Sequence, residues 1–170
     1  PPLLYDLTEL QRDCNKKFGF SAQKTLSIAQ DLYEKRKMIT YPRTDSRYLS
    51  EDMKQKVKNT LLKLQRVQKY TSFISYIFSQ ENIPFHKRII DNSKVTDHHA
   101  IIPTDGKISL ESLTEEEKKV YHVIVMRFMA VFYPQYIYMV TKVITIVEQQ
   151  KFISKGTTVL QEGWTAIYKA

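Results

Sequence analysis

The chain has 170 residues, 42% of them hydrophobic, which is typical of a folded protein with about one domain or one and a half small ones. Its single cysteine, Cys14, excludes an intrachain disulfide, and no apolar run approaches the roughly 20 residues that a membrane-spanning helix needs. The net charge of +8 favours an anionic partner, nucleic acid or a membrane surface.

The positive charge is concentrated at one end of the chain. Residues 1–69 hold fifteen Lys and Arg against eight Asp and Glu, whereas residues 70–107 hold four against four and residues 108–170 seven against six. Such clustering is typical of a nucleic-acid-binding surface, and a solvated basic surface is the alternative. Because the chain begins with Pro1 rather than Met, we expect a piece of a longer protein.

Capping residues predict the first two helices. Thr8 and Gln11 have the spacing of a capping box, so a helix should run from there to Gly19, whose free φ suits the residue after a helix. Ser21 should cap a second helix that ends near Lys35. The apolar stripe of this second helix contains Ala22, Leu26, Ala29 and Tyr33.

The next part of the chain alternates between extended and helical patterns. Residues 38–41 read as a short extended piece that ends at Pro42. Ser50 should start a third helix, followed by a short helix over 71–79 and an irregular stretch over 80–98. The apolar face of the third helix contains Met53, Val57, Leu61 and Leu64.

The last helical pattern begins at a second capping box. Residues 100–102 form a short buried extended segment, and Thr114 with Glu117 predicts a helix that reaches about Phe132. Pro134 then marks a change of period.

Beyond Pro134 the apolar residues are spaced by two, as in strands. We expect strands over 136–146 and 152–160, joined by a turn over 148–151, and a last short strand from Gly163 to about residue 168. The sequence therefore predicts an α+β, mainly helical fold, with a helical domain over 1–133 and a β-rich tail over 134–170.

The segment around Tyr41 carries the chemistry of most interest. Pro42 keeps this segment extended, and residues two apart in an extended chain face the same side, so the Tyr41 phenol and the Arg43 guanidinium should point together. A phenol is almost wholly protonated at neutral pH, so a nucleophilic Tyr needs nearby positive charge or a base. Arg43 supplies charge that stabilises a phosphoryl transition state. A surface turn with a solvent-facing Tyr is the alternative.

Two further features have both a functional and a structural interpretation. His98 and His99 lead into the buried residues 100–102, which places them either at the edge of a site or in a hydrogen-bonded structural pair. The basic helix over 51–69 either contacts phosphates or is simply solvated. No His, Cys or carboxylate spacing predicts a metal site, and no Gly-rich phosphate loop is present.

Two long motifs make the chain recognisable. Residues 39–49, ITYPRTDSRYL, resemble the active-site segment of type IA DNA topoisomerases, and residues 93–104, SKVTDHHAIIPT, resemble a second signature of that family. The Pro after the Tyr and the paired His are more similar to the topoisomerase III branch than to the topoisomerase I branch. Residues 7–22 and the tail around Gly163 are similar in order and spacing.

The resemblance implies a role for several residues. Tyr41 matches the nucleophile that forms a 5′-phosphotyrosine link with single-stranded DNA, without ATP, and Arg43 matches the arginine that orients the scissile phosphate. His98 matches a histidine that contacts DNA near the cut, and His99 matches a supporting histidine. Further DNA contacts are expected from Thr40, Arg47 and Lys94.

The resemblance also implies an architecture. The helical domain is similar to the winged-helix-like domain that carries the nucleophile, and the β-rich tail is similar to part of an arch, which is incomplete here. The family's toprim domain, whose acids hold Mg²⁺, is outside this chain. We therefore expect no metal bound by this chain, and we expect the isolated chain neither to cleave nor to relax DNA efficiently.

The expected setting is the cytoplasm of a bacterium, at the nucleoid, with single-stranded DNA and the remaining domains of the longer protein as partners and no membrane contact. Two alternatives remain. One is a winged-helix module that holds nucleic acid without chemistry, which has no need of the pair Tyr41 and Arg43. The other is a scaffolding domain, which predicts no salt-dependent affinity for single strands.

Overall fold

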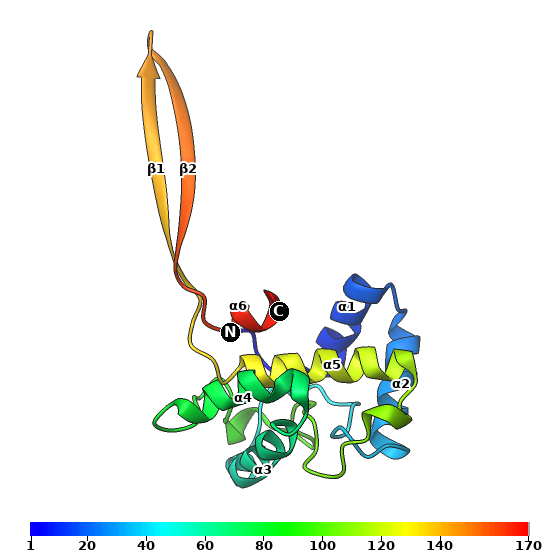
Figure 1. Ribbon diagram of the computed structural model, residues 1–170. Helices are drawn as coiled ribbons and strands as arrows, with labels where there is room; N and C mark the ends of the chain where they lie inside the picture. Colours follow the sequence, from blue (N-terminus) through cyan, green and yellow to red (C-terminus); the bar gives the residue numbers. More distant parts are fainter. Residues whose placement is uncertain (170) are drawn as a thin grey trace.

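The computed structural model describes residues 1–169 and consists of a helical body from which a long β-hairpin projects (Figure 1). The chain is α+β and mainly helical, as the sequence predicts. The helices are α1 Leu7–Phe18, α2 Ala22–Glu34, α3 Lys54–Leu64, α4 Gln68–Ser79, α5 Glu115–Ala130 and α6 Thr165–Lys169. Three short 3-10 turns cover Glu51–Met53, Asn92–Lys94 and Leu110–Ser112, and the strands are β1 Ile137–Val147 and β2 Gln150–Gln161.

Capping residues fix three ends of the first two helices. The predicted capping box at Thr8 is wrong, because Asp6, two residues earlier, accepts the Glu9 amide at 2.8 Å and α1 begins at Leu7. Gly19 ends α1 in the left-handed conformation, φ 70°, as predicted. Ser21 caps α2 as predicted, by accepting the Lys24 amide at 3.0 Å.

The start of the third helix differs from the prediction. Ser50 makes no capping bond to the backbone and donates instead to Asp52. A 3-10 turn over Glu51–Met53 therefore precedes α3, which begins at Lys54. The next helix, α4, begins at Gln68, three residues before the predicted start. The predicted apolar face of the third helix is buried: Met53, Val57, Leu61 and Leu64.

The core is built around α5. The capping box of Thr114 and Glu117 starts α5 as predicted, and α1, α2, α4 and α6 all contact it. The helix ends at Ala130, earlier than expected, yet Phe132 remains fully buried with its ring against Phe128. Burying a Phe side chain contributes about 1.5–3 kcal/mol, so this aromatic pair is a large single element of core stability.

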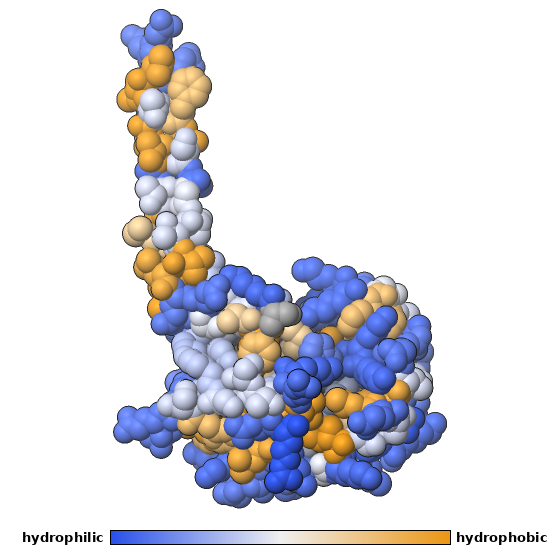
Figure 2. All heavy atoms as spheres, viewed as in Figure 1, coloured by the Kyte–Doolittle hydropathy of each residue, from blue (hydrophilic) through white to orange (hydrophobic). Residues whose placement is uncertain are grey.

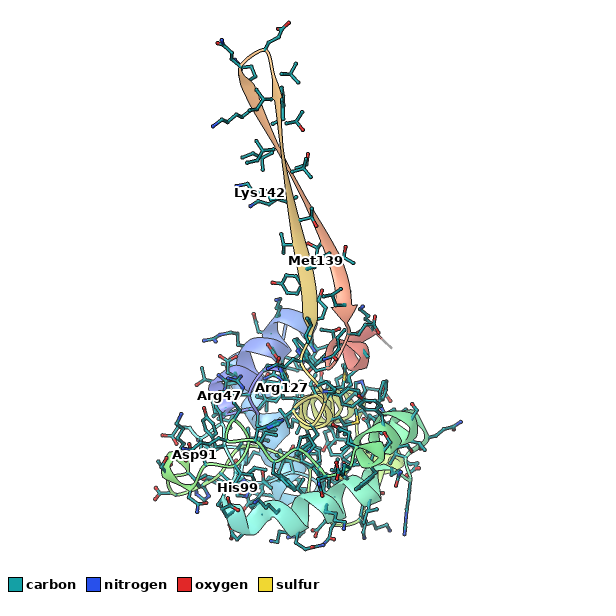
Figure 3. The ribbon with its side chains drawn as sticks, turned by 90° about the vertical axis from the view of Figure 1, so that its left-hand side faces the viewer. Arg47, Asp91, His99, Arg127, Met139 and Lys142 are labelled. Carbon is teal, nitrogen blue, oxygen red and sulfur yellow. The ribbon has the colours of Figure 1, made fainter. Side chains whose placement is uncertain are left out.

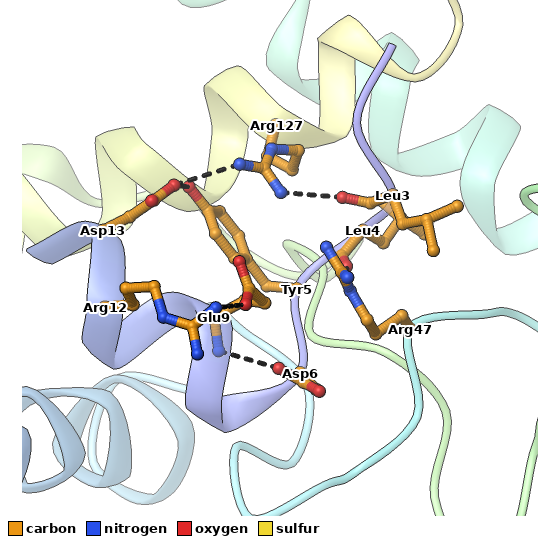
Figure 4. A network of polar contacts seen from close by, with 9 residues as sticks. All are labelled: Leu3, Leu4, Tyr5, Asp6, Glu9, Arg12, Asp13, Arg47 and Arg127. Carbon is orange, nitrogen blue, oxygen red and sulfur yellow. Dashed lines mark hydrogen bonds and ion pairs between the residues drawn. The ribbon is translucent and has the colours of Figure 1, made fainter.

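A buried ion pair ties the N-terminal segment to α5 (Figure 4). The guanidinium of Arg127, whose side chain is only 10% exposed, donates to Asp13 of α1 at 3.0 Å and to the Leu3 carbonyl at 2.8 Å. It also lies 4.1 Å from the centre of the Tyr5 ring, and the Tyr5 hydroxyl donates to the same Asp13 oxygen. Burial raises the pKa of Tyr5, so this hydroxyl stays protonated and acts as a donor.

The extended segments of the body are joined by single bridges rather than by a regular sheet. Tyr5 pairs with Ile101, Ile39 with Pro103, and Leu49 with Ile90. Residues 100–102 are buried, as predicted. These bridges bring the N-terminal segment and both motif segments side by side.

The hairpin consists of two antiparallel strands that pair from Val147 and Gln150 at the tip to Ile137 and Gln161 at the base. Glu148 and Gln149 both have positive φ, 49° and 65°, as a tight two-residue hairpin turn requires. The turn is therefore shorter than the predicted 148–151. Both faces are exposed, and apolar side chains gather near the tip and the base (Figure 2).

The predicted last strand is wrong, because Thr165–Lys169 form the helix α6. Gly163, at φ 53°, reverses the chain so closely that a Cβ there would lie 2.2 Å from the Gln135 carbonyl oxygen. The Trp164 amide then bonds the Pro134 carbonyl at 3.0 Å, and Ile167 packs into the body at 2% exposure. This packing, which a local pattern does not encode, favours helix over strand.

Candidate active site

Residues 38–40, directly before Tyr41, are held extended by backbone hydrogen bonds to residues 102–104. The Thr40 amide donates to the Ile102 carbonyl at 2.9 Å, and the Thr104 amide donates to the Met38 carbonyl at 3.0 Å. Beyond Tyr41, Pro42, Thr44 and Ser46 are buried, whereas Arg43 and Asp45 are exposed. This alternation is the one predicted for a stiff extended segment, and it directs Arg43 outward.

Tyr41 is half-buried between two other rings. The Tyr33 ring meets it edge-on, with 5.3 Å between centroids and 79° between planes. The His98 ring lies on it with centroids 4.1 Å apart and planes tilted by 34°. The phenol therefore packs against a ring on two sides and stays partly exposed, whereas three other tyrosines, Tyr5, Tyr70 and Tyr121, are fully buried.

Arg43 and His98 line one cleft of about 530 Å³. The remaining lining residues are Leu7, Thr8, Thr44, Asp45, Thr96 and Asp97. The Asp45 carboxylate accepts the Thr96 hydroxyl at 3.1 Å, which joins the two motifs across the cleft. Within residues 1–169, no hydrogen bond or ion pair engages the Arg43 guanidinium, so its five donors face solvent and are free for an anion.

The structure links Tyr41 and Arg43 through His98 rather than by direct contact. His98 touches the Tyr41 ring and also lines the Arg43 cleft. The neighbouring His99 points elsewhere, since its Nδ1 lies 2.7 Å from the Ala100 carbonyl oxygen. The two histidines therefore occupy different surroundings, as residues on opposite faces of an extended segment do.

The other predicted site residues have structural contacts. The Thr40 hydroxyl donates to the Ala100 carbonyl at 3.1 Å and accepts the Ile102 amide at 3.0 Å. Arg47 Nε donates to the Leu4 carbonyl at 3.2 Å, and the Lys94 ammonium lies 4.9 Å from the centre of the Tyr48 ring. His99 and Arg47 both lie on the helical body, away from the hairpin (Figure 3). Their roles in DNA binding stay predictions.

The N-terminal segment is hydrogen-bonded to both motif segments, a contact that the sequence patterns did not indicate. The Leu7 amide donates to the Thr44 carbonyl at 3.0 Å, and the Ile101 amide donates to the Tyr5 carbonyl at 2.9 Å. Tyr33 was also missed as a site residue, because its helical spacing assigned it to the apolar stripe of α2. Tyr33 lies in the last turn of α2, just before the Tyr41 segment, and this proximity in sequence could have indicated a place near the site.

The basic helix predicted over 51–69 presents exposed cations along α3 and just beyond it. They are Lys56, Lys58, Lys63, Arg66 and Lys69. Lys63 and Arg66 line a hollow of about 400 Å³ that Asp105 also borders. Lys54, by contrast, pairs with Glu51 at 2.7 Å.

Across the part of the chain that the structure describes, no three His, Cys, Asp or Glu side chains gather closely enough to hold a metal ion. The residues that the structure describes therefore form no magnesium site. None of the helices within residues 1–169 is long and apolar enough to cross a membrane.

Comparison with known proteins places this geometry in a family. The model of a family described as DNA topoisomerase matches residues 1–170. The chain is 48% identical over 167 residues to a DNA topoisomerase 3 of Bacillus subtilis and 47% identical over 171 residues to one of Bacillus cereus, covering 98% and 99% of this chain. It is also similar to the full-length topoisomerase I of Thermotoga maritima, with a TM-score of 0.68, 28% identity and 100% of this chain covered. The chain spans 23% of the length of each Bacillus relative and 27% of the Thermotoga structure.

Proposed function

The chain belongs to the type IA DNA topoisomerase family, and we propose that it carries the nucleophile with which such an enzyme cuts and rejoins one DNA strand. The nucleophile of the proposal is Tyr41. The observation that carries it is the position of this phenol, whose ring lies against His98, a wall residue of the cleft that presents the unpaired Arg43.

The proposed reaction is a transesterification. The Tyr41 oxygen attacks a backbone phosphorus, a new O–P bond forms, and the bond from phosphorus to the 3′ oxygen breaks. The phenol proton leaves to an acceptor, and the departing 3′ oxygen takes up a proton. Reversal by the 3′-OH restores the strand, and no ATP is needed because one phosphate ester replaces another.

Arg43 is the group of this chain best suited to stabilise the phosphate. Its exposed fork of donors matches the geometry of phosphate oxygens, and stabilising the charge that develops in the transition state lowers the barrier. The N-terminus of α1, at Leu7 and Thr8, borders the same cleft, but the Asp6 carboxylate that caps this helix offsets its positive potential, so Arg43 supplies the positive charge. Asp45 and Asp97 oppose anion binding at the cleft rim, so we place the phosphate nearest Arg43.

His98 acts in this proposal as a positioning and DNA-contacting residue. Its ring fixes the Tyr41 ring from one side and lines the cleft on the other. Thr40 and Lys94 contact the opposite motif segment, whereas Arg47 bonds the Leu4 carbonyl and His99 lies against the carbonyl of its neighbour Ala100. We propose that these four residues contact DNA only at the edges of the site.

The remaining parts of the proposal follow the family. The helical body, over 1–133, acts as a winged-helix-like domain, and the hairpin of the tail, over 134–170, belongs to an arch completed elsewhere in a longer protein. The partner is single-stranded DNA, and magnesium is held by a separate toprim domain. The isolated chain is then inactive in relaxation and decatenation, and the enzyme works at the nucleoid in the cytoplasm.

Covalent trapping tests the proposal. A labelled single-stranded oligonucleotide is mixed with magnesium and a longer protein that contains this chain and the toprim domain, then denatured and separated by gel. A protein-linked band should form with wild type and with Tyr48→Phe, a matched neighbouring tyrosine, and disappear with Tyr41→Phe. A band that survives Tyr41→Phe contradicts the proposal. Binding without any band in wild type favours the non-catalytic winged-helix module.

A further inference from the structure

A second hollow, of about 430 Å³, borders the Tyr41 segment on the side of α2. Its lining residues are Tyr33, Glu34, Lys37, Ile39 and Thr104. Tyr41 contacts one wall residue of each hollow, His98 in the Arg43 cleft and Tyr33 in this one. The proposed reaction requires a strand that continues on both sides of the cut, and this hollow shares no lining residue with the Arg43 cleft.

Lys37 lies in the turn that ends α2, which the Met38 amide closes by donating to the Leu32 carbonyl at 2.9 Å. Its φ is +54°, in the left-handed region that favours glycine, and the two other non-glycine residues with positive φ in the described chain form the hairpin turn. The Thr104 hydroxyl donates to the Lys37 carbonyl at 2.7 Å and secures the turn. The turn fixes where the Lys37 side chain leaves the backbone, beside the Tyr33 ring on the wall of the hollow.

The charge of Lys37 has no partner, unlike that of its neighbours. Lys35 pairs with Asp31 at 3.4 Å, and Arg36 pairs with Glu117 at 3.1 Å. Among residues 1–169 no carboxylate lies within ion-pair distance of the exposed Lys37 ammonium. An exposed, unpaired cation next to a half-buried aromatic ring is the combination that proteins use to bind single-stranded nucleic acid.

We infer that this hollow binds a nucleotide of the DNA strand beside the phosphate that Tyr41 attacks, with its base on the Tyr33 ring and its phosphate at Lys37. The inference rests on the proposed function and extends it to a second part of the strand. Glu34 also lines the hollow and accepts the Gln30 side-chain amide at 2.8 Å. Its negative charge disfavours phosphate on that wall, which leaves Lys37 as the phosphate contact.

The surface beyond the hollow is consistent with a strand that continues. Asp105 follows Thr104 directly and borders the next hollow, which presents Lys63 and Arg66. The walls of the two hollows therefore adjoin at Thr104 and Asp105, and the second presents two further exposed cations.

Equilibrium binding of this chain to a fluorescently labelled oligothymidylate, without magnesium and over a series of salt concentrations, tests the inference. Lys37→Ala should weaken binding and reduce the slope of log affinity against log salt by about one, because one phosphate contact is lost. Lys35→Ala, which removes a neighbouring exposed cation, should leave the slope unchanged.

A second pair of variants tests the ring. Tyr33→Leu should weaken binding roughly 5- to 150-fold, the range for loss of one base stack, whereas Tyr33→Phe keeps the ring and should bind as wild type does. Equal slopes for Lys37→Ala and Lys35→Ala, equal affinities for Tyr33→Leu and wild type, or no binding by wild type would overturn the inference. Covalent trapping at Tyr41 tests the proposed function independently of these variants. A trapped band together with an unchanged salt slope for Lys37→Ala would therefore contradict the nucleotide site in this hollow and leave the proposed function intact.

Discussion

Replacing Arg127 by Met removes the cation from the buried cluster that joins α5, α1 and the N-terminal segment. The Asp13 carboxylate, 23% exposed, keeps the Tyr5 hydroxyl as a donor but loses its charged partner at 3.0 Å, and the Leu3 carbonyl loses a donor at 2.8 Å. Removing one partner of a buried ion pair costs about 3–5 kcal/mol, and the residual exposure of Asp13 favours the lower end. We therefore expect a loss of about 3 kcal/mol in the free energy of unfolding.

Urea unfolding followed by circular dichroism measures this loss. With a slope of about 2 kcal/mol per M, the midpoint should fall by roughly 1.5 M. Lys118→Met is the matched control, because it breaks an exposed pair with Glu115 at 3.1 Å and should cost at most about 0.5 kcal/mol. If Arg127→Met costs no more than this control, the cluster does not stabilise the fold and the reasoning is refuted.

Three further predictions concern stability and pH. Burial opposes ionisation of Glu117, but the hydrogen bonds that it accepts from Arg36 and Thr114 outweigh this effect and lower its pKa. Glu117→Gln should therefore reduce the free energy of unfolding by about 2 kcal/mol at pH 7. The difference from wild type should shrink as the pH of the unfolding experiment is lowered towards 3. Burial, aided by nearby lysines, lowers the pKa of His122 to about 4. The free energy of unfolding of wild type should therefore fall by about 1–2 kcal/mol between pH 6.5 and pH 4, after allowance for solvent screening of the partly exposed ring. His122→Gln should flatten this pH dependence when unfolding is measured over the same range. Gly163→Ala should reduce the free energy of unfolding by about 3 kcal/mol or more, measured by thermal unfolding, because the added Cβ would clash with the Gln135 carbonyl. Gly19→Ala, where the Cβ meets open space at φ 70°, should reduce it by only about 1 kcal/mol. Equal losses for the two variants would contradict the steric argument.

Local patterns predicted the elements whose ends are set by nearby residues. Ser21, Gly19 and the capping box at Thr114 act within a few residues of themselves, and the structure confirms them. Asp6 and Thr8 are both good caps, and the sequence alone did not decide between them; the Leu7 bond to the Thr44 carbonyl is a tertiary contact that accompanies the earlier start. The helix α6 was missed for the same reason, since its packing depends on residues far along the chain.

The candidate site was predictable in part. The extended segment with exposed Arg43 follows from Pro42 and the alternation of buried and exposed residues. The ring contacts of Tyr41 with Tyr33 and His98 bring together residues eight and fifty-seven positions away, and no spacing rule encodes them. The role of His98 in linking Tyr41 to the Arg43 cleft therefore required the fold.

Mapping the covalent adduct tests the central claim most directly. The longer protein is reacted with single-stranded DNA and magnesium, denatured and digested with nuclease and protease, and the peptides are analysed by mass spectrometry. We predict a nucleotide joined through its 5′ phosphate to the hydroxyl of Tyr41, and to none of the other ten tyrosines. A 3′-phosphate link, or an adduct on any other residue, would contradict the account.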